Sequence, residues 1–274
     1  MSRMQNILDK AEREGAVLRI RPLADQDPVE RSGVAVAEAV TMASLPAPAI
    51  QPVHGPARTS TARRIDRTLV AAHSPDANTA RQYRSLCTRI VHADANSPVK
   101  VIMITSPGAG EGKSVTAANL ALTMAREYAK PTCLVDANLR SPKLHEMFGV
   151  DGAGAGPGLI DVLAGRATLD DALTFIEPAG ITLLPAGSGG EHPAELLSTP
   201  VMRRVLDSLR GQFDRIIVDA PAALPMVDLG LMEALADRIV LVVRSGVTPK
   251  AAIQDALSTI DTQRLLGVVL NEAM

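Results

Sequence analysis

The stretch VIMITSPGAGEGKSVTAANLA, from Val101 to Ala121, joins an apolar run, a glycine-rich segment and an alanine-rich helical pattern. Strand, glycine loop and helix in this order are the context that a phosphate-binding loop requires. Glycine lets backbone N–H groups turn inward around phosphate oxygens, and the start of the following helix attracts the same negative charge. The residues expected to contact a nucleotide here are Gly108, Gly110, Glu111, Gly112, Lys113, Ser114 and Val115.

Two side chains of this loop have specific predicted roles. Lys113 would reach the β- and γ-phosphates, and the Ser114 hydroxyl would be a ligand of Mg²⁺. The strict pattern has glycine five residues before Gly112, where this chain has Pro107. Proline removes one N–H donor but fixes a turn, so the loop deviates from the strict pattern and keeps its phosphate cradle.

Two aspartates follow apolar runs that read as strands. Asp136 ends the run in TCLVDANLRSP, and Asp219 ends the run in FDRIIVDAPAAL. A single aspartate in this position is often a helix cap or a turn former. Because the carboxyl ends of parallel strands meet at one edge of a sheet, both carboxylates are expected beside the loop. Carboxylate oxygens are the ligands that Mg²⁺ prefers, so a magnesium site is predicted at Ser114, Asp136 and Asp219.

The rest of the chain alternates short apolar runs with helical patterns. Most of the runs are apolar throughout, as in strands covered on both faces. This alternation predicts an α/β fold in three layers, with a mostly parallel sheet between helices. The expected strands span residues 100–105, 132–136, 181–184, 215–219, 238–243 and 266–270.

Composition divides the chain into three predicted segments. Residues 1–20 have apolar positions at helical spacing and are expected to form a short amphipathic helix. Residues 21–74 are rich in proline and alanine and are expected to form a flexible linker with little fixed structure. Residues 75–274 are expected to form the nucleotide-binding domain.

Bulk properties exclude several classes of protein. A formal net charge of -2 gives no general argument for binding nucleic acid, and we expect no nucleic-acid partner. Cys87 and Cys133 lack metal-ligand spacing and are expected to be reduced thiols. No apolar run approaches the roughly 18 residues that span a bilayer, and the polar N-terminus is unlike a signal peptide. A cytoplasmic protein is therefore expected.

These residues resemble the bacterial tyrosine kinases of capsule and exopolysaccharide assembly. The resemblance rests mainly on TSPGAGEGKSVTAANLA, LVDANLRSPKLHEMFG, FDRIIVDAPAALPMVDLG and LLGVVLN. It implies a P-loop NTPase fold of the deviant Walker subclass that includes MinD and ParA, with ATP and Mg²⁺ as cofactors. By position, Lys113, Asp136 and Asp219 would be catalytic, with Asp136 a candidate base for the acceptor hydroxyl. Arg140 and Asn271 would lie on the nucleotide side, with Asn271 near adenine.

The chain departs from the pattern of this family in three ways. The second aspartate of the family's motif after the loop is Asn138 here, and an amide cannot take up a proton. The family's oligomerisation helix carries Glu, Arg and Arg where this chain has Arg81, Arg84 and Cys87, which puts the usual ring in doubt. A tyrosine cluster is usual in the family, whereas Tyr83 and Tyr128 are the tyrosines here, and both are expected to pack rather than accept phosphate.

Three hypotheses follow. The first is an ATP-dependent tyrosine kinase that works with a transmembrane polysaccharide co-polymerase or chain-length protein, which would recruit it to the inner face of the cell membrane. The second is a catalytically weak or non-kinase ATP-binding regulatory subunit, a nucleotide switch, of the same export complex. The third is a positioning ATPase of the ParA or MinD type, which Gly108 disfavours because those proteins carry a signature lysine at that position. A homo-oligomer fits the first hypothesis.

Overall fold

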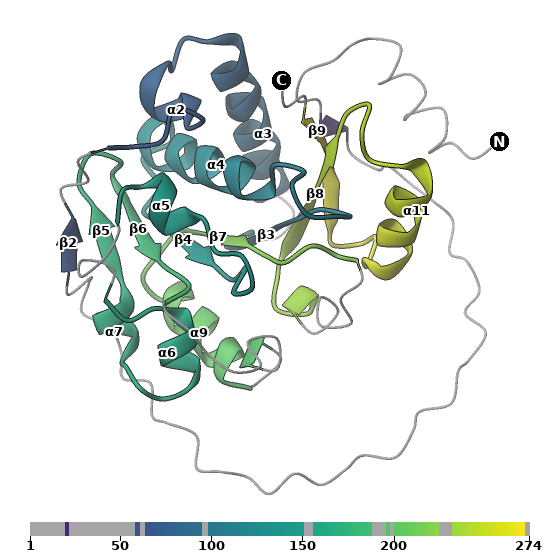
Figure 1. Ribbon diagram of the computed structural model, residues 1–274. Helices are drawn as coiled ribbons and strands as arrows, with labels where there is room; N and C mark the ends of the chain where they lie inside the picture. The colour runs from purple at the N-terminus through teal and green to yellow at the C-terminus, as the bar shows by residue number, and fades with distance from the viewer. Residues whose placement is uncertain are drawn as a thin grey trace, which may run out of the picture.

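A computed structural model describes residues 20–21, 58–60, 64–94, 98–150, 156–187, 196–197, 200–224 and 232–271. Within these ranges one sheet has nine strands in the order β1-β9-β8-β3-β7-β4-β6-β5-β2 (Figure 1). Neighbouring strands are parallel except in the pairs β1–β9 and β5–β6. The strands are β1 (Ile20–Arg21), β2 (Arg58–Ser60), β3 (Val101–Thr105), β4 (Thr132–Asp136), β5 (Thr174–Ile176), β6 (Ile181–Leu184), β7 (Arg215–Asp219), β8 (Arg238–Arg244) and β9 (Leu265–Asn271).

Helices cover both faces of this sheet. The first four pack on one face, and the last four pack on the other (Figure 1). They are α2 (Val70–His73), α3 (Asn78–Asp94), α4 (Lys113–Glu127), α5 (Leu144–Met147), α6 (Leu159–Leu163), α7 (Leu169–Ala172), α9 (Pro200–Arg210) and α11 (Lys250–Thr259). The mostly parallel three-layer α/β fold expected from the sequence is confirmed.

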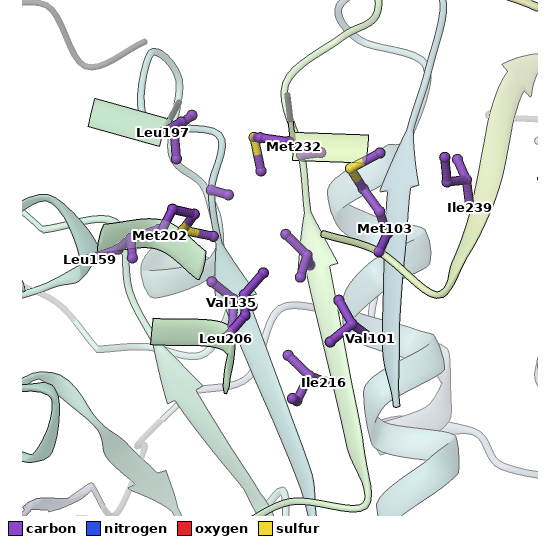
Figure 2. Packing of buried hydrophobic residues seen from close by; sticks show 14 of the residues in the cluster. Val101, Met103, Val135, Leu159, Leu197, Met202, Leu206, Ile216, Met232 and Ile239 are labelled. Carbon is purple, nitrogen blue, oxygen red and sulfur yellow. The ribbon is translucent and has the colours of Figure 1, made fainter. Parts of the chain in front are cut away.

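The central strands are apolar throughout because each face contacts a separate core. Val101 and Met103 of β3 belong to the core under α9 and α11, whereas Ile102 and Ile104 belong to the core under α3 and α4. Figure 2 shows the first of these cores, where Met202 of α9 lies beside β4 and β7. Burying a side chain of this size contributes about 1.5–3 kcal/mol, so these two cores hold the central strands rigidly.

The structure extends the expected organisation in two places. β5 was not predicted, because three residues paired antiparallel to β6 give too short a pattern to detect. The predicted linker, residues 21–74, contains β2 and α2, and Leu69 within it is fully buried. The division into three segments remains a prediction, and the helix expected within residues 1–20 lies outside the described residues except for Ile20.

None of the helices in the described ranges combines the length and apolarity needed to cross a membrane.

Candidate functional site

The glycine loop lies between β3 and α4 at the carboxyl edge of the sheet, where β3, β7 and β4 end side by side. Its first residues are bound to the segment that follows β7. The Thr105 hydroxyl donates to the Pro221 carbonyl at 2.8 Å, and the Ala223 N–H donates to the Ser106 carbonyl at 2.7 Å. The loop is therefore held against the strand that carries Asp219.

Gly112 requires the absence of a side chain. It has φ +93° at the residue preceding α4, and a Cβ there would overlap the carboxamide of Asn271. That carboxamide donates from Nδ2 to the Glu111 carbonyl at 3.0 Å. The structure therefore places Asn271 against the loop backbone, where it supports the loop, and its predicted contact with adenine stays a prediction.

A cleft of about 610 Å³ opens at the loop. Six of the predicted nucleotide-binding residues line it, namely Gly110, Gly112, Lys113, Ser114, Val115 and Arg140. Gly108 and Glu111 of the loop are not among the lining residues, and Asp136 and Asp219 are fully buried.

Other lining residues were not predicted from the sequence. Lys143, Glu146 and Met147 come from the start and end of α5, and Asp66 and Thr68 come from the segment before α2. The α5 residues lie in a stretch that follows Asp136 closely and could have been considered. Asp66 and Thr68 carry no such signal, because long-range contacts place them.

Asp136 and Asp219 are register partners on β4 and β7. Burial raises the pKa of Asp136 to about 7, and the charge of Asp219 adds to this shift. Burial raises the pKa of Asp219 to about 6, with Lys113 and Ser114 opposing the shift. Two coupled carboxyl groups thus titrate near neutral pH beside a cationic lysine.

The two carboxylates differ in their partners. Asp136 accepts backbone N–H groups of Asn138, Lys143 and Leu144 at 3.2, 3.2 and 3.1 Å, and so fixes the start of α5. Neither oxygen of Asp219 makes a hydrogen bond of ordinary geometry among the described residues, although the Ser114 hydroxyl is close enough to lower its pKa. Buried polar atoms without partners are rare, and a bound water or ion is one explanation for them.

This arrangement fits a magnesium ion. Asp219 offers two unpartnered oxygens beside the Ser114 hydroxyl, which are the oxygen ligands that Mg²⁺ prefers. The described residues form no cluster of three or more His, Cys, Asp or Glu. A cation here would therefore take its remaining ligands from water and phosphate, as Mg²⁺ commonly does at nucleotide sites.

Asn138 has a structural partner in the turn after β4. It is 7% exposed, and its Nδ2 donates to the Ser141 carbonyl at 2.8 Å. A carboxylate could not donate this bond. The amide therefore stabilises the turn that carries Arg140.

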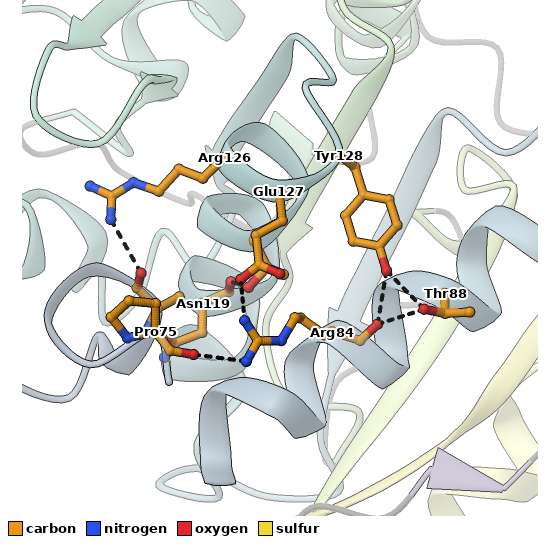
Figure 3. A network of polar contacts seen from close by, with 9 residues as sticks. Pro75, Arg84, Thr88, Asn119, Arg126, Glu127 and Tyr128 are labelled. Carbon is orange, nitrogen blue, oxygen red and sulfur yellow. Dashed lines mark hydrogen bonds and ion pairs between the residues drawn. The ribbon is translucent and has the colours of Figure 1, made fainter. Parts of the chain in front are cut away.

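Helix α3 carries residues of the other two departures, the altered oligomerisation helix and the missing tyrosine cluster. Arg84 pairs with Glu127 of α4 at 3.1 Å and donates to the Pro75 carbonyl at 2.9 Å, so its guanidinium is bound within the chain (Figure 3). Cys87 is fully buried, and burial raises the pKa of its thiol. Tyr83 is 3% exposed, and burial raises its pKa to about 12. The Tyr128 hydroxyl bonds Thr88 at 2.8 Å, so both tyrosines pack as expected.

Comparison with known proteins identifies relatives of one kind. The chain is 35% identical over 211 residues to tyrosine-protein kinase YwqD of Bacillus subtilis, covering 76% of this chain and 87% of YwqD. It is 34% identical over 217 residues to the succinoglycan biosynthesis transport protein ExoP of Rhizobium meliloti, covering 77% of this chain and 27% of ExoP. The chain thus spans most of YwqD and about a quarter of ExoP. No protein-family model matches it.

Two solved structures illustrate the similarity in fold. The chimerical protein CapA2B2 is 29% identical with a TM-score of 0.70, covering 76% of this chain and 92% of that one. Cobyrinic acid a,c-diamide synthase from Mycobacterium smegmatis, with bound ADP and magnesium, is 25% identical with a TM-score of 0.52 and covers 62% and 72%.

Proposed function

This chain belongs to the bacterial tyrosine kinase family, and we propose that it binds ATP with Mg²⁺ and transfers the γ-phosphoryl group to protein tyrosine. The observation that carries the proposal is the buried pair Asp136 and Asp219, of which Asp219 interacts with Lys113 and Ser114 of the cleft. Asp219 there has unpartnered oxygens.

Each residue has a proposed role in binding or transfer. Lys113 and the loop N–H groups would hold the phosphates, and Ser114 and Asp219 would hold Mg²⁺, with Asp136 linked to the same ion. The ion supplies neutralisation of the charge that develops on the transferred group. Arg140, which lines the cleft, adds a second positive charge on the phosphate side.

Asp136 is the proposed base for the acceptor hydroxyl. A carboxylate has about four lone-pair sites, and three backbone N–H groups occupy sites on Asp136, which leaves one. Burial raises its pKa to about 7 in the metal-free protein, and a bound Mg²⁺ would lower this pKa, so that a carboxylate able to accept a proton is present at neutral pH.

The proposed process is exopolysaccharide or capsule assembly at the inner face of the cell membrane. The name of ExoP, a succinoglycan biosynthesis transport protein, supports this assignment. The partner would be a transmembrane polysaccharide co-polymerase or chain-length protein that recruits this chain to the membrane. Family membership favours this assignment over a ParA-type or MinD-type positioning ATPase.

One observation favours a second candidate, an ATP-binding switch without kinase activity. Asn138 supplies an amide where the family pattern has a second carboxylate, and its bond to the Ser141 carbonyl gives it a structural use. A site that has lost one carboxylate can bind ATP and signal its presence through a conformational change.

A time course with Mg²⁺ and γ-labelled ATP separates the two candidates. Label on protein tyrosine that disappears in Lys113→Ala is the result expected of a kinase. Two results would overturn the kinase proposal in favour of the switch, both with tight ATP binding. In the first, the label appears only in free phosphate; in the second, it stays on ATP. The assay is run with and without an added tyrosine polymer, because Tyr83 is buried and Tyr128 is hydrogen-bonded.

A further inference from the structure

The segment 64–74 lines two neighbouring pockets. Asp66 and Thr68 line the nucleotide cleft. Residues on either side of them line a second pocket of about 550 Å³, namely Arg64, Ile65, Arg67, His73 and Ser74. The segment thus forms a wall shared by the nucleotide cleft and a basic pocket.

This wall is fixed at its first end by α5. The Asp66 N–H donates to the Met147 carbonyl at 2.8 Å. Gly149, with φ +64°, lets the Arg64 carbonyl approach, since a Cβ on it would lie 2.6 Å from that oxygen. His73 closes the turn through ring contacts of 3.0 and 3.1 Å to the carbonyls of Ile65 and Asp66.

The other end of the wall is fixed by Asn119, which is fully buried on α4. Its Oδ1 accepts the Ala71 N–H at 2.9 Å, and its Nδ2 donates to the Thr68 carbonyl at 3.1 Å. Arg126, two turns further along α4, donates to the Ala71 carbonyl at 3.2 Å; Figure 3 shows both side chains on the same helix. The helix that follows the phosphate loop therefore sets the position of the wall.

Charge indicates what the wall contacts. Hydrogen bonds from the Thr68 hydroxyl at 2.7 Å and its N–H at 2.8 Å lower the pKa of Asp66, so its carboxylate is ionised. The positive charge of Arg64 also lowers this pKa, and the ionised carboxylate can accept hydroxyl or N–H donors of a polypeptide. Arg64 and Arg67, which line the basic pocket, are exposed and attract acidic groups.

We propose that segment 64–74, positioned by Asn119, is the docking element for the acceptor polypeptide, and that Arg64 and Arg67 bind acidic side chains close to the acceptor tyrosine. This inference rests on the proposed kinase function and adds the class of substrate to it. Asn119 acts through the wall and is a positioning residue.

The first test compares an acidic copolymer of Glu and Tyr with a basic copolymer of Lys and Tyr. In the double variant Arg64→Glu/Arg67→Glu we expect the KM for the acidic copolymer to rise about tenfold and the preference to shift toward the basic one. The Kd for ATP should stay within about twofold, because neither residue lines the nucleotide cleft. An unchanged KM ratio between the two copolymers would overturn the proposal.

The second test replaces Asn119 by Asp, which keeps the size and the acceptor but loses the amide that donates to the carbonyls of Thr68 and Val115. Thr123→Val is the matched control, since Thr123 is equally buried on the same helix and donates only to the Asn119 carbonyl. We expect Asn119→Asp to raise the KM for both copolymers by a larger factor than the Kd for ATP, and Thr123→Val to change neither. Equal effects of the two variants would show a merely structural role and contradict the positioning claim.

Binding separates this proposal from the kinase function. If the wild-type chain phosphorylates neither copolymer, the kinase proposal fails, and fluorescence anisotropy of a labelled Glu and Tyr copolymer still tests docking. Weaker binding by Arg64→Glu/Arg67→Glu would support the docking element. Equal binding by wild type and this variant would refute it.

Discussion

At the residue scale, Asp136 and Asp219 end adjacent strands but have different roles. Three N–H groups hold Asp136 and make it the anchor of α5, whereas Asp219 accepts no main-chain N–H among the described residues and interacts with Ser114 and Lys113 instead. Main-chain hydrogen bonds thus decide which of the two carboxylates is available to bind a cation. Because both are buried, their charges should also affect the stability of the nucleotide-free protein.

Asp219→Asn should stabilise the nucleotide-free protein at alkaline pH. The pKa of Asp219 rises from 3.8 to about 6 on folding, so its carboxyl group favours the folded state below about pH 4. That contribution is lost as the pH rises through about 6. We expect the variant to exceed wild type by on the order of 2 kcal/mol at pH 8 and to match it below pH 4, measured by urea unfolding with EDTA. An advantage that did not change with pH would contradict the titration of Asp219.

Asn138→Asp should destabilise the turn after β4. The new carboxylate would face the Ser141 carbonyl, to which the amide now donates at 2.8 Å. Asn138→Ala is the control, because it removes the donor without adding a charge. We expect the free energy of unfolding to fall by about 1 kcal/mol in the alanine variant and by more in the aspartate variant at pH 7. Greater stability of the aspartate variant would show that the amide has no structural use.

Elements differ in how far the sequence predicts them. The strands β3, β4, β6, β7, β8 and β9 lie within one residue of the predicted ends, because a strand buried on both faces needs an unbroken apolar run. The carboxylates at the ends of β4 and β7 follow from the same rule, since parallel strands end at one edge.

Segment 64–74 shows where this reasoning fails. Its apolar run, Leu69 to Ala72, is too short to predict a fixed element, and contacts with Asn119, 48 and 51 residues away, hold it in place. The local sequence pattern cannot predict a segment that long-range hydrogen bonds hold in place. Asn271 is similar, because its bond to Glu111 joins residues 160 positions apart.

The glycine loop gives a prediction at the scale of elements. Gly112→Ala should cost more stability than Gly110→Ala, although both glycines have positive φ, +93° and +77°. A Cβ at Gly110 meets nothing within 4 Å, whereas one at Gly112 overlaps Asn271 at the end of β9. We expect about 1 kcal/mol of loss from backbone strain for Gly110→Ala and a larger loss for Gly112→Ala.

The double variant Gly112→Ala/Asn271→Ala isolates the overlap. It should recover part of the loss, because the smaller side chain makes room for the new methyl group. Thermal unfolding of the four proteins without nucleotide measures both effects. Equal losses in the two single glycine variants would mean that Asn271 moves aside freely.

At the scale of the molecule, a ring of hydrogen bonds connects the elements that surround the cleft. Asp136 holds the start of α5, the end of α5 holds Asp66, and Asn119 returns the wall to α4 and the loop. A ligand that binds in the cleft therefore contacts several elements that these hydrogen bonds connect. Nucleotide binding should in consequence stabilise the whole fold rather than the loop alone.

ATP with Mg²⁺ should raise the melting temperature of the chain, and more at pH 8 than at pH 5.5. A ligand at a hundredfold excess over its Kd adds about 2.7 kcal/mol, which corresponds to roughly 5–10 °C for a domain of this size. The pKa values of Asp136 and Asp219, about 7 and about 6, mean that Mg²⁺ competes with protons at low pH and meets two carboxylates at high pH. Differential scanning fluorimetry measures the shift, with ATP and EDTA as one control and Lys113→Ala as the other. Because both controls keep the fold but lose the cation or the phosphate contact, each should shift less than wild type with Mg²⁺. A shift of equal size with EDTA at pH 8 would show that Asp219 holds no cation in the nucleotide complex.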